Sequence, residues 1–340
     1  MQIKIQTLTP LWTGGVDGKM DRIHETGIIG SMRWWYEAIV RGLGGWACDP
    51  TSDNKCRYNP RDIRSPKEQL CPACYVFGAT GWRRQFRLEV IENAISDASI
   101  QRLIKANRRY TYTNKSGKKH TRTPKWYFET PKAGQISIEA YSLSQGFQLG
   151  IIEGLLQFMI EWTALGAKAQ MGFGVMQPIS DRLDANVFLN CIKGIDNNHN
   201  SNYLPSLQNI FLAKIQLQNA NDRDIFDLKY DLRQLFAVDD NLRHFIMGTI
   251  KGQRTASKIK VSRPYDNGLI RVWGWIPEKA SVYSEKWNRE SILQCIYGHL
   301  DSYYSLKVWR EMSSVRDKVD KNQEDPRIFL KSLLKVAVSE

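Results

Sequence analysis

Four of the six cysteines lie in the first quarter of the chain, at spacings that suit a metal ion. Two residues separate Cys71 from Cys74, so both thiolates can bind one ion, whereas Cys48 and Cys56 lie further apart than in a standard zinc ribbon. Four thiolates complete a tetrahedral zinc site and leave no position open for a catalytic water. The pattern therefore predicts a structural zinc ion bound by Cys48, Cys56, Cys71 and Cys74, with free thiols as the alternative.

A glycine-rich segment at 166–174 has residue types that could contact a phosphate or a 2′-hydroxyl. Gly166, Gly172 and Gly174 let the backbone approach a ligand closely, and Lys168 and Gln170 lie between them. No Gly-Lys-Ser/Thr follows, which excludes a P-loop, and a strand follows the segment, which excludes a dinucleotide-binding fingerprint. The segment predicts either an RNA contact or a tight helix-to-strand connection packed against its own domain.

Residues 102–125 carry nine Lys and Arg and no acidic residue. Clustered cations release counterions from phosphates when they bind nucleic acid, and interleaved aromatic rings can stack on unpaired bases. This combination favours single-stranded RNA over a duplex, with a solvated charged loop as the alternative. We expect this basic loop to be mobile when no RNA is bound. The candidate RNA-binding residues here are Arg108, Arg109, Lys118, Lys119, Arg122 and the adjoining Trp126.

Two arginine–tryptophan clusters extend the basic pattern. Arg33 precedes Trp34 and Trp35 on an expected helix, where two adjacent side chains cannot both face the core. One tryptophan could therefore meet a partner or a base, or lie half-buried at a domain seam. Arg83 and Arg84 follow Trp82 and are further candidates for RNA contacts.

Residues for acid–base chemistry are few. His24 and His244 stand in basic surroundings and could serve metal-independent RNA cleavage, but no second histidine or nucleophile accompanies either. Asp17 and Asp21 could bind a divalent cation, although two isolated carboxylates are weak support. The sequence therefore predicts structural or phosphate-contacting histidines and no catalytic residues.

The composition describes a basic protein with a sizeable core. The net charge is +13, the pI is about 9.4, and 42% of the residues are hydrophobic, with 11 Trp among them. Such a charge points to nucleic acid or an anionic membrane as the partner, or to solubility alone. No run of about 18 apolar residues exists, and the alternating N-terminus lacks the apolar stretch of a signal peptide, so we expect a cytoplasmic protein without a membrane partner.

The order of the expected elements places these residues in two domains. Strands are expected at 1–8, 86–91 and 135–143, helices at 28–41 and 148–165, and a Cys-rich insertion at 46–80. The second half is expected to contain strands at 211–217, 257–263 and 269–276 and helices at 227–237, 288–303 and 324–338. The order fits an α+β fold of two ferredoxin-like β-α-β-β-α-β domains with insertions, spanning 1–194 and 209–340, with a linker at 195–208.

Four segments, taken in their order along the chain, resemble the RAMP superfamily of CRISPR-associated proteins. They are Leu8–Gly15, Thr26–Ala38, the Phe-Gly turn in Cys74–Trp82, and Leu165–Gly174. The Arg-Trp-Trp helix is also similar to the end subunit of the Cmr (type III-B) effector complex, as are Gly252–Lys258 and Val272–Gly274, which add Arg254 and Lys258 to the RNA-binding candidates.

This resemblance implies a role within an assembly. Such subunits have two ferredoxin-like domains, lie near the 3′ end of the guide RNA, and help capture single-stranded target RNA without slicing it. Guide RNA, target RNA and other RAMP subunits are the implied partners. A RAMP endoribonuclease, for guide processing or target cleavage, and a purely structural adaptor are the alternatives.

Overall fold

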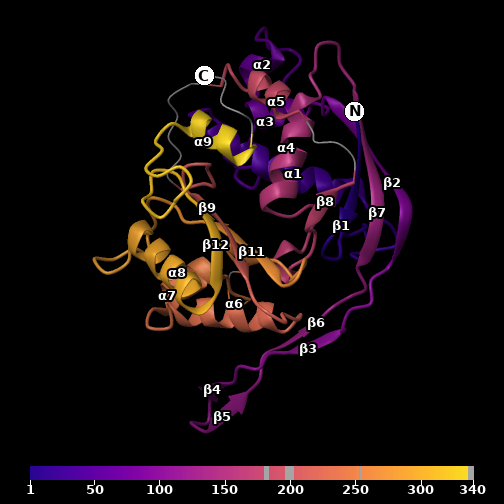
Figure 1. Ribbon diagram of the computed structural model, residues 1–340. Coiled ribbons are helices and arrows are strands. Elements are labelled where there is room, and N and C mark those ends of the chain that lie inside the picture. The colour runs from indigo at the N-terminus through magenta and orange to yellow at the C-terminus, as the bar shows by residue number, and fades with distance from the viewer. Residues whose placement is uncertain (180–183, 196–202, 251, 253, 336–340) are drawn as a thin grey trace.

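The computed structural model describes residues 1–179, 184–195, 203–250, 252 and 254–335. It confirms a mixed α+β fold, with two four-stranded antiparallel sheets and two smaller two-stranded ones. Figure 1 shows the first sheet at one side, the second half of the chain beside it, and a long arm that leads away from both. None of the described helices is both long and apolar enough to cross a membrane.

The first sheet has the spatial order β2-β7-β1-β8, and all neighbouring strands are antiparallel. Its strands are β1 (Gln2–Thr7), β2 (Phe86–Asp97), β7 (Lys132–Ser142) and β8 (Met176–Pro178). Successive side chains of a strand point to opposite faces, so Ile3 and Ile5 enter the core while Lys4 between them is exposed.

Helices α1 (Glu25–Gly42) and α4 (Gly150–Trp162) share the core of this sheet. In α1, Ile28, Met32, Trp35 and Ile39 recur at helical spacing and are all buried. The shorter elements of this half are α2 (Pro66–Gln69), α3 (Pro72–Phe77), the 3-10 turn η1 (Ala169–Met171) and α5 (Ala185–Cys191).

The predicted basic loop forms an arm of strands rather than an irregular loop. β3 (Leu103–Lys105) pairs with β6 (Lys125–Tyr127), and β4 (Tyr110–Thr113) pairs with β5 (Lys119–Arg122) at the tip (Figure 1). Alternating Tyr and Thr in β4 favour a strand, and the turn before β5 contains Gly117 at φ 80°, where glycine is unstrained. The mobility expected of this segment stays a prediction.

A bulge bends the ribbon that leads into the arm. The register of β2 and β7 shifts between Glu92 and Ala94, and Gly134, at φ 135°, pairs with the next residue, Ile95. A Cβ atom at Gly134 would lie 1.8 Å from the Ala94 carbonyl oxygen, so only glycine fits there. Bulges increase twist and redirect a strand, and this one lies where the ribbon leaves the first sheet.

The second half repeats the same arrangement. Its sheet has the order β10-β11-β9-β12 and is antiparallel throughout. Its elements are β9 (Ile210–Gln216), α6 (Asp224–Gln234), α7 (Asp240–Met247), β10 (Ile259–Val261), β11 (Leu269–Trp275), α8 (Arg289–Tyr303) and β12 (Ser305–Arg310). The sequence did not predict α5, α7 or β12.

The two halves pack closely together. In β9, Phe211 and Ile215 belong to the core of the second half, whereas Leu212 belongs to the core of the first. Helix α9 (Pro326–Leu333) returns to the first half, where the indole of Trp162 donates to the Leu333 carbonyl at 2.7 Å.

Parts of the predicted linker and last helix lie outside the described residues, namely 196–202 and 336–338. The second part of the linker packs against α1, because Leu207 is buried and a Cβ atom at Gly42 would come within 2.2 Å of the Leu207 Cβ. The domain boundaries at 194 and 209 stay a prediction.

Candidate metal centre and basic surface

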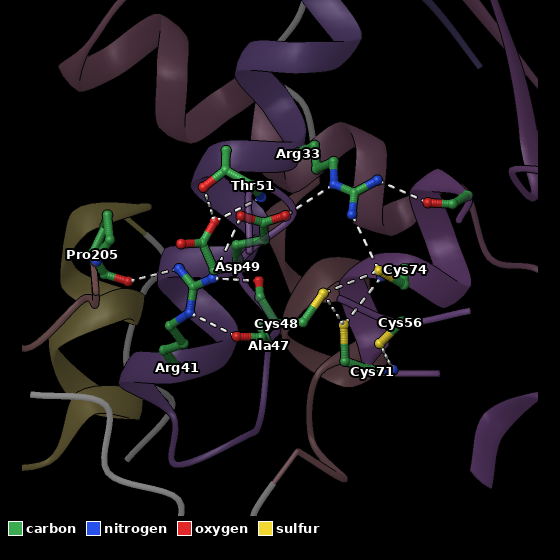
Figure 2. Close-up of polar contacts among 12 residues, drawn as sticks. Arg33, Arg41, Ala47, Cys48, Asp49, Thr51, Cys56, Cys71, Cys74 and Pro205 are labelled. Atoms are coloured by element: carbon green, nitrogen blue, oxygen red, sulfur yellow. Dashed lines mark hydrogen bonds and ion pairs between the residues drawn. The ribbon is translucent and has the colours of Figure 1, made fainter. Parts of the chain in front are cut away.

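The four predicted cysteine ligands converge in the insertion that follows α1. Cys48 comes from the loop after that helix, Cys56 from the next loop, and Cys71 and Cys74 from the start of α3 (Figure 2). Cys71 caps α3, and its sulfur accepts a hydrogen bond from the Cys74 amide at 3.4 Å. All four sulfurs are buried and lie within 4.8 Å of one another.

These distances suit a tetrahedral metal site. A zinc–sulfur bond of about 2.3 Å places the corners of a tetrahedron about 3.8 Å apart. The Cys48 sulfur lies 3.4 Å from that of Cys74 and 3.9 Å from that of Cys71. Both separations far exceed the length of a disulfide bond, about 2.05 Å, so the four cysteines are free to bind an ion. In the described part of the chain, no other group of three or more metal-ligating side chains converges in this way.

Hydrogen bonds among the sulfurs favour the thiolate form at Cys48 and the thiol form at the two cysteines of α3. Bonds with Cys56, Cys71 and Cys74 lower the pKa of Cys48, whereas the bond with Cys48 raises the pKa of both Cys71 and Cys74. The Cys71 amide donates to the Cys56 sulfur at 3.4 Å. A metal ion bound here would replace the protons that the four sulfurs share, and all four would then bind as thiolates.

A ladder of charges on α1 adjoins the cluster (Figure 2). Arg33, Glu37 and Arg41 are four residues apart and share one helix face. The Arg33 Nε donates to Glu37 at 2.9 Å, and Arg41 lies 3.5 Å from the same carboxylate. Glu37 is almost fully buried; burial raises its pKa, and the two arginines oppose this shift.

The glycine-rich segment is a tightly packed connection. A Cβ atom at Gly174 would lie 2.0 Å from the Leu165 carbonyl oxygen, and one at Gly172 would lie 2.7 Å from the Arg263 amide. Gly166 is equally confined, by Leu11 and the carbonyl oxygen of Trp12. Packing alone therefore accounts for these three glycines.

The polar side chains of the same segment differ in their availability. The Lys168 ammonium lies over the Trp12 ring at 3.5 Å and bonds to Glu129 at 2.9 Å, with about one third of the side chain exposed. Gln170 is exposed, and its carbonyl oxygen accepts from Lys229. An RNA contact by Lys168 would have to compete with its carboxylate partner.

The tip of the arm carries exposed cations without acidic partners. Arg109, Lys118, Lys119 and Arg122 are exposed, and within the described structure no carboxylate lies within ion-pair distance of them. The rings of Tyr110 and Tyr112 are 6.1 Å apart, and His120 stacks on Tyr112 at 5.6 Å. Charge and stacking surface therefore occur together at the tip.

The root of the arm is fixed on α6 instead. Arg108 forms two bonds of 3.0 and 3.1 Å to Asp231, and its amide donates to Asp227 at 3.2 Å. Trp126 stacks on Phe226 with 4.3 Å between the rings. Arg108 and Trp126, both RNA-binding candidates by sequence, thus have partners inside the molecule.

The remaining candidates are scattered. Arg33 donates to the Cys74 sulfur at 3.1 Å, and Lys258 is buried with its ammonium 2.9 Å from the Phe245 carbonyl oxygen. Arg83 and Arg254 are exposed, and Arg84 lies against Phe86. Gln253, within a segment used for the resemblance, lies outside the described residues.

The structure adds a group of cations that the sequence analysis missed. Lys229 of α6, Lys260 of β10 and Arg263 gather where the glycine-rich segment meets the second half, and we call them the seam cations. Arg263 is only 2% exposed and lies between Phe128 and Phe173; it pairs with Asp222, while its Nε and Nη2 lack partners among the described residues. No sequence signal joins them, because they come from separate segments.

The acid–base candidates are also separated. His24 directly precedes α1, and its Nε2 lies 2.6 Å from Asp21, whereas His244 lies far along the chain on α7. Asp17 accepts from the Lys19 amide at 2.9 Å in a local turn. Asp17 and Asp21 therefore do not form part of any converging ligand group among the residues described.

The chain belongs to the RAMP superfamily, as the sequence predicted: the model of that family matches residues 4–177, just over half of the chain. No curated protein matches it. Similar solved structures include apo Cmr1 from Pyrococcus furiosus, 14% identical with a TM-score of 0.41, covering 88% of this chain and 96% of that chain. Another is the type III-B Cmr-beta complex bound to cognate target RNA and AMPPnP, 13% identical with a TM-score of 0.48, covering 89% and 98%.

Proposed function

We propose that the chain is a non-catalytic, RNA-binding subunit of a type III-B (Cmr) CRISPR effector complex. In this role it contacts guide RNA near its 3′ end, helps capture single-stranded target RNA, and packs against other RAMP subunits. Membership of the RAMP superfamily supports the proposal, together with the Arg-Trp-Trp helix.

The tip of the arm is the observation that carries the RNA-binding proposal. Its cations have no carboxylate partner in the described structure, so binding a phosphate breaks no ion pair. Tyr112 is exposed beside them and can stack on an unpaired base. The acidic α6 face, with Asp224, Asp227 and Asp231, lines a pocket beside the arm root, and its charge would repel RNA there.

Filter binding of labelled single-stranded RNA at increasing salt tests the proposal. We expect affinity to fall as salt rises, without cleavage, whether or not a divalent metal is present. Replacing Lys118, Lys119 and Arg122 with Gln should weaken binding and reduce the slope of log affinity against log salt by about 2, at about 0.7 per phosphate contact on a single strand.

The matched control replaces Lys279, Lys318 and Lys321, three exposed lysines on loops outside the arm, with Gln. It removes the same charge and should leave the slope nearly unchanged. Equal effects of both triple variants would show that net charge, and not the tip of the arm, accounts for RNA binding. RNA cleavage that is abolished in His24→Ala would favour the ribonuclease alternative.

We also propose that each half is a ferredoxin-like unit. Both halves follow the chain order β-α-β-β-α-β, apart from the insertion, the arm and α7, and both place the first strand between the third and the fourth. This repetition supports the predicted division into 1–194, a linker at 195–208, and 209–340.

The four cysteines form the second part of the proposal, a structural zinc site. Four buried sulfurs at tetrahedral spacing offer a closed ligand set, which would stabilise an insertion with few regular elements. Reduced cysteines of this kind fit a cytoplasmic protein. Metal analysis of the purified chain should find about one zinc ion per molecule, and Cys71→Ser should lose it; a metal-free, folded wild type would contradict the site.

A further inference from the structure

We propose that Arg33 is a positioning residue of this zinc site, and that with Glu37 and Arg41 it fastens both ends of the insertion to α1. The inference rests on the proposed zinc site and goes beyond it, because it concerns residues that are not ligands. It also assigns to Arg33 a role other than RNA binding.

Every nitrogen of the Arg33 guanidinium has a partner inside the protein (Figure 2). Nη2 donates to the Cys74 sulfur at 3.1 Å, Nη1 to the Gly78 carbonyl oxygen at 2.8 Å, and Nε to Glu37 at 2.9 Å. The side chain is 22% exposed, so a phosphate could reach it only by displacing these bonds. A planar fork of donors suits such a set of fixed acceptors, which the single ammonium of Lys could not reproduce.

The charge of a zinc-loaded site explains why an arginine contacts Cys74. A divalent ion neutralises only half of the charge of four thiolates, so the loaded site keeps excess negative charge in a buried setting. Buried charge is costly unless it is paired and hydrogen-bonded. The Arg33 guanidinium donates to the Cys74 sulfur, and this hydrogen bond offsets part of the charge.

Arg41 binds the backbone at the start of the insertion, as Arg33 does at its end. Its Nε donates to the Ala47 carbonyl oxygen at 3.0 Å and its Nη2 to that of Cys48 at 2.8 Å, so it holds the backbone of the first ligand. Nη1 donates to the Pro205 carbonyl oxygen at 3.1 Å, in the described part of the linker. Glu37 lies between the two arginines and orients both.

This arrangement joins three separate segments to one helix face. The start of the insertion, its end at Cys74 and Gly78, and the entry to the second half all meet residues on α1. An ion that holds Cys48 and Cys74 together would therefore stabilise the same geometry that the ladder imposes. Loss of Arg33 should weaken metal binding even though all four ligands remain.

The test compares zinc affinity and zinc release in the full chain, using competition with a colorimetric chelator. We expect Arg33→Met to bind zinc about 10-fold more weakly or worse, the range seen when partners of metal ligands are removed. Arg33→Lys should be intermediate, because a single ammonium keeps the charge but cannot reach all three acceptors of Arg33. Arg61→Met changes an exposed arginine of the same insertion and should match the wild type.

The outcomes separate the two proposals. A wild type that binds no zinc removes the metal site itself, whereas zinc affinity unchanged in folded Arg33→Met overturns only the role of Arg33. If Arg33→Met does not fold, unaltered zinc release from Arg33→Lys overturns it equally. Zinc-loaded Arg33→Met should keep its affinity for single-stranded RNA; a selective loss of RNA binding with normal zinc affinity would show a direct RNA contact instead.

Discussion

Lys229 is held in surroundings that disfavour its charge. Burial lowers its pKa to about 7, and the nearby charges of Arg263 and Lys260 add to the effect. Its ammonium bonds to the Gln170 carbonyl oxygen and has no carboxylate partner among the described residues. The charged Lys229 therefore destabilises the folded state. An RNA phosphate bound beside the glycine-rich segment would offset this effect.

We therefore expect Lys229→Met to raise the thermal midpoint of the RNA-free chain at pH 6, by about 2 °C or more. Below about pH 7, Lys229 is charged in both the folded and the unfolded states, so the folded state carries the full penalty. Between about pH 7 and pH 10 only the unfolded state keeps the proton on Lys229. The free energy of unfolding of the wild type therefore increases, relative to that of the variant, as pH rises. Thermal denaturation across this pH range should show that the difference in midpoint between Lys229→Met and the wild type becomes smaller.

Lys279→Met, at an exposed lysine, is the control for this measurement and should shift the midpoint little at any pH. A difference between wild type and Lys229→Met that grows with pH would contradict the assignment of a buried charge.

The arm depends on α6 for its position, although the two are more than a hundred residues apart in sequence. Asp227 accepts from the amides of Asn107 and Arg108 at 2.9 and 3.2 Å, and Asp227 is almost fully buried. These bonds fix the backbone of the root, while the tip beyond it is exposed. The arm thus has a fixed base and a free end.

Replacing Asp227 with Ala should release the root without disrupting the body of the protein. Bonds to a charged acceptor contribute about 1.5–3 kcal/mol, so opening of the arm should increase about 10-fold or more. Limited trypsin digestion reports this directly, because the nine Lys and Arg of 102–125 are cleavage sites.

Asp301→Ala, at an exposed position on α8, should digest like the wild type. Unchanged cleavage of Asp227→Ala would mean that stacking of Trp126 on Phe226 is sufficient to hold the root.

Elements with a strong local pattern were predictable. Ile28, Met32 and Ile39 mark α1 by periodicity alone, and the cysteine spacing indicated a common site. β12 was missed because it follows α8 without a glycine or proline to mark the change, at Tyr304. The shape of the arm was not predictable either, because contacts with the distant α6 fix its root and no local sequence pattern indicates them.

At the scale of the whole molecule, the sequence indicated two halves but not how they interlock. The Arg271 side chain of β11 donates to the Thr163 carbonyl oxygen at 2.9 Å, and Lys214 of β9 pairs with Glu161 of α4. These contacts depend on the folded geometry of both halves, so no local pattern reveals them. The same holds for Arg33, whose partner at Cys74 changes its interpretation from an RNA contact to a support of the metal site.

The return of α9 to the first half affects the order in which the chain can complete its folding. Phe329, Leu330 and Leu333 enter the core formed by α1 and α4, and Trp162 bonds to the Leu333 carbonyl. During synthesis the first half leaves the ribosome well before these residues exist, so part of its apolar surface stays uncovered until α9 emerges. Until then that surface is open to wrong partners.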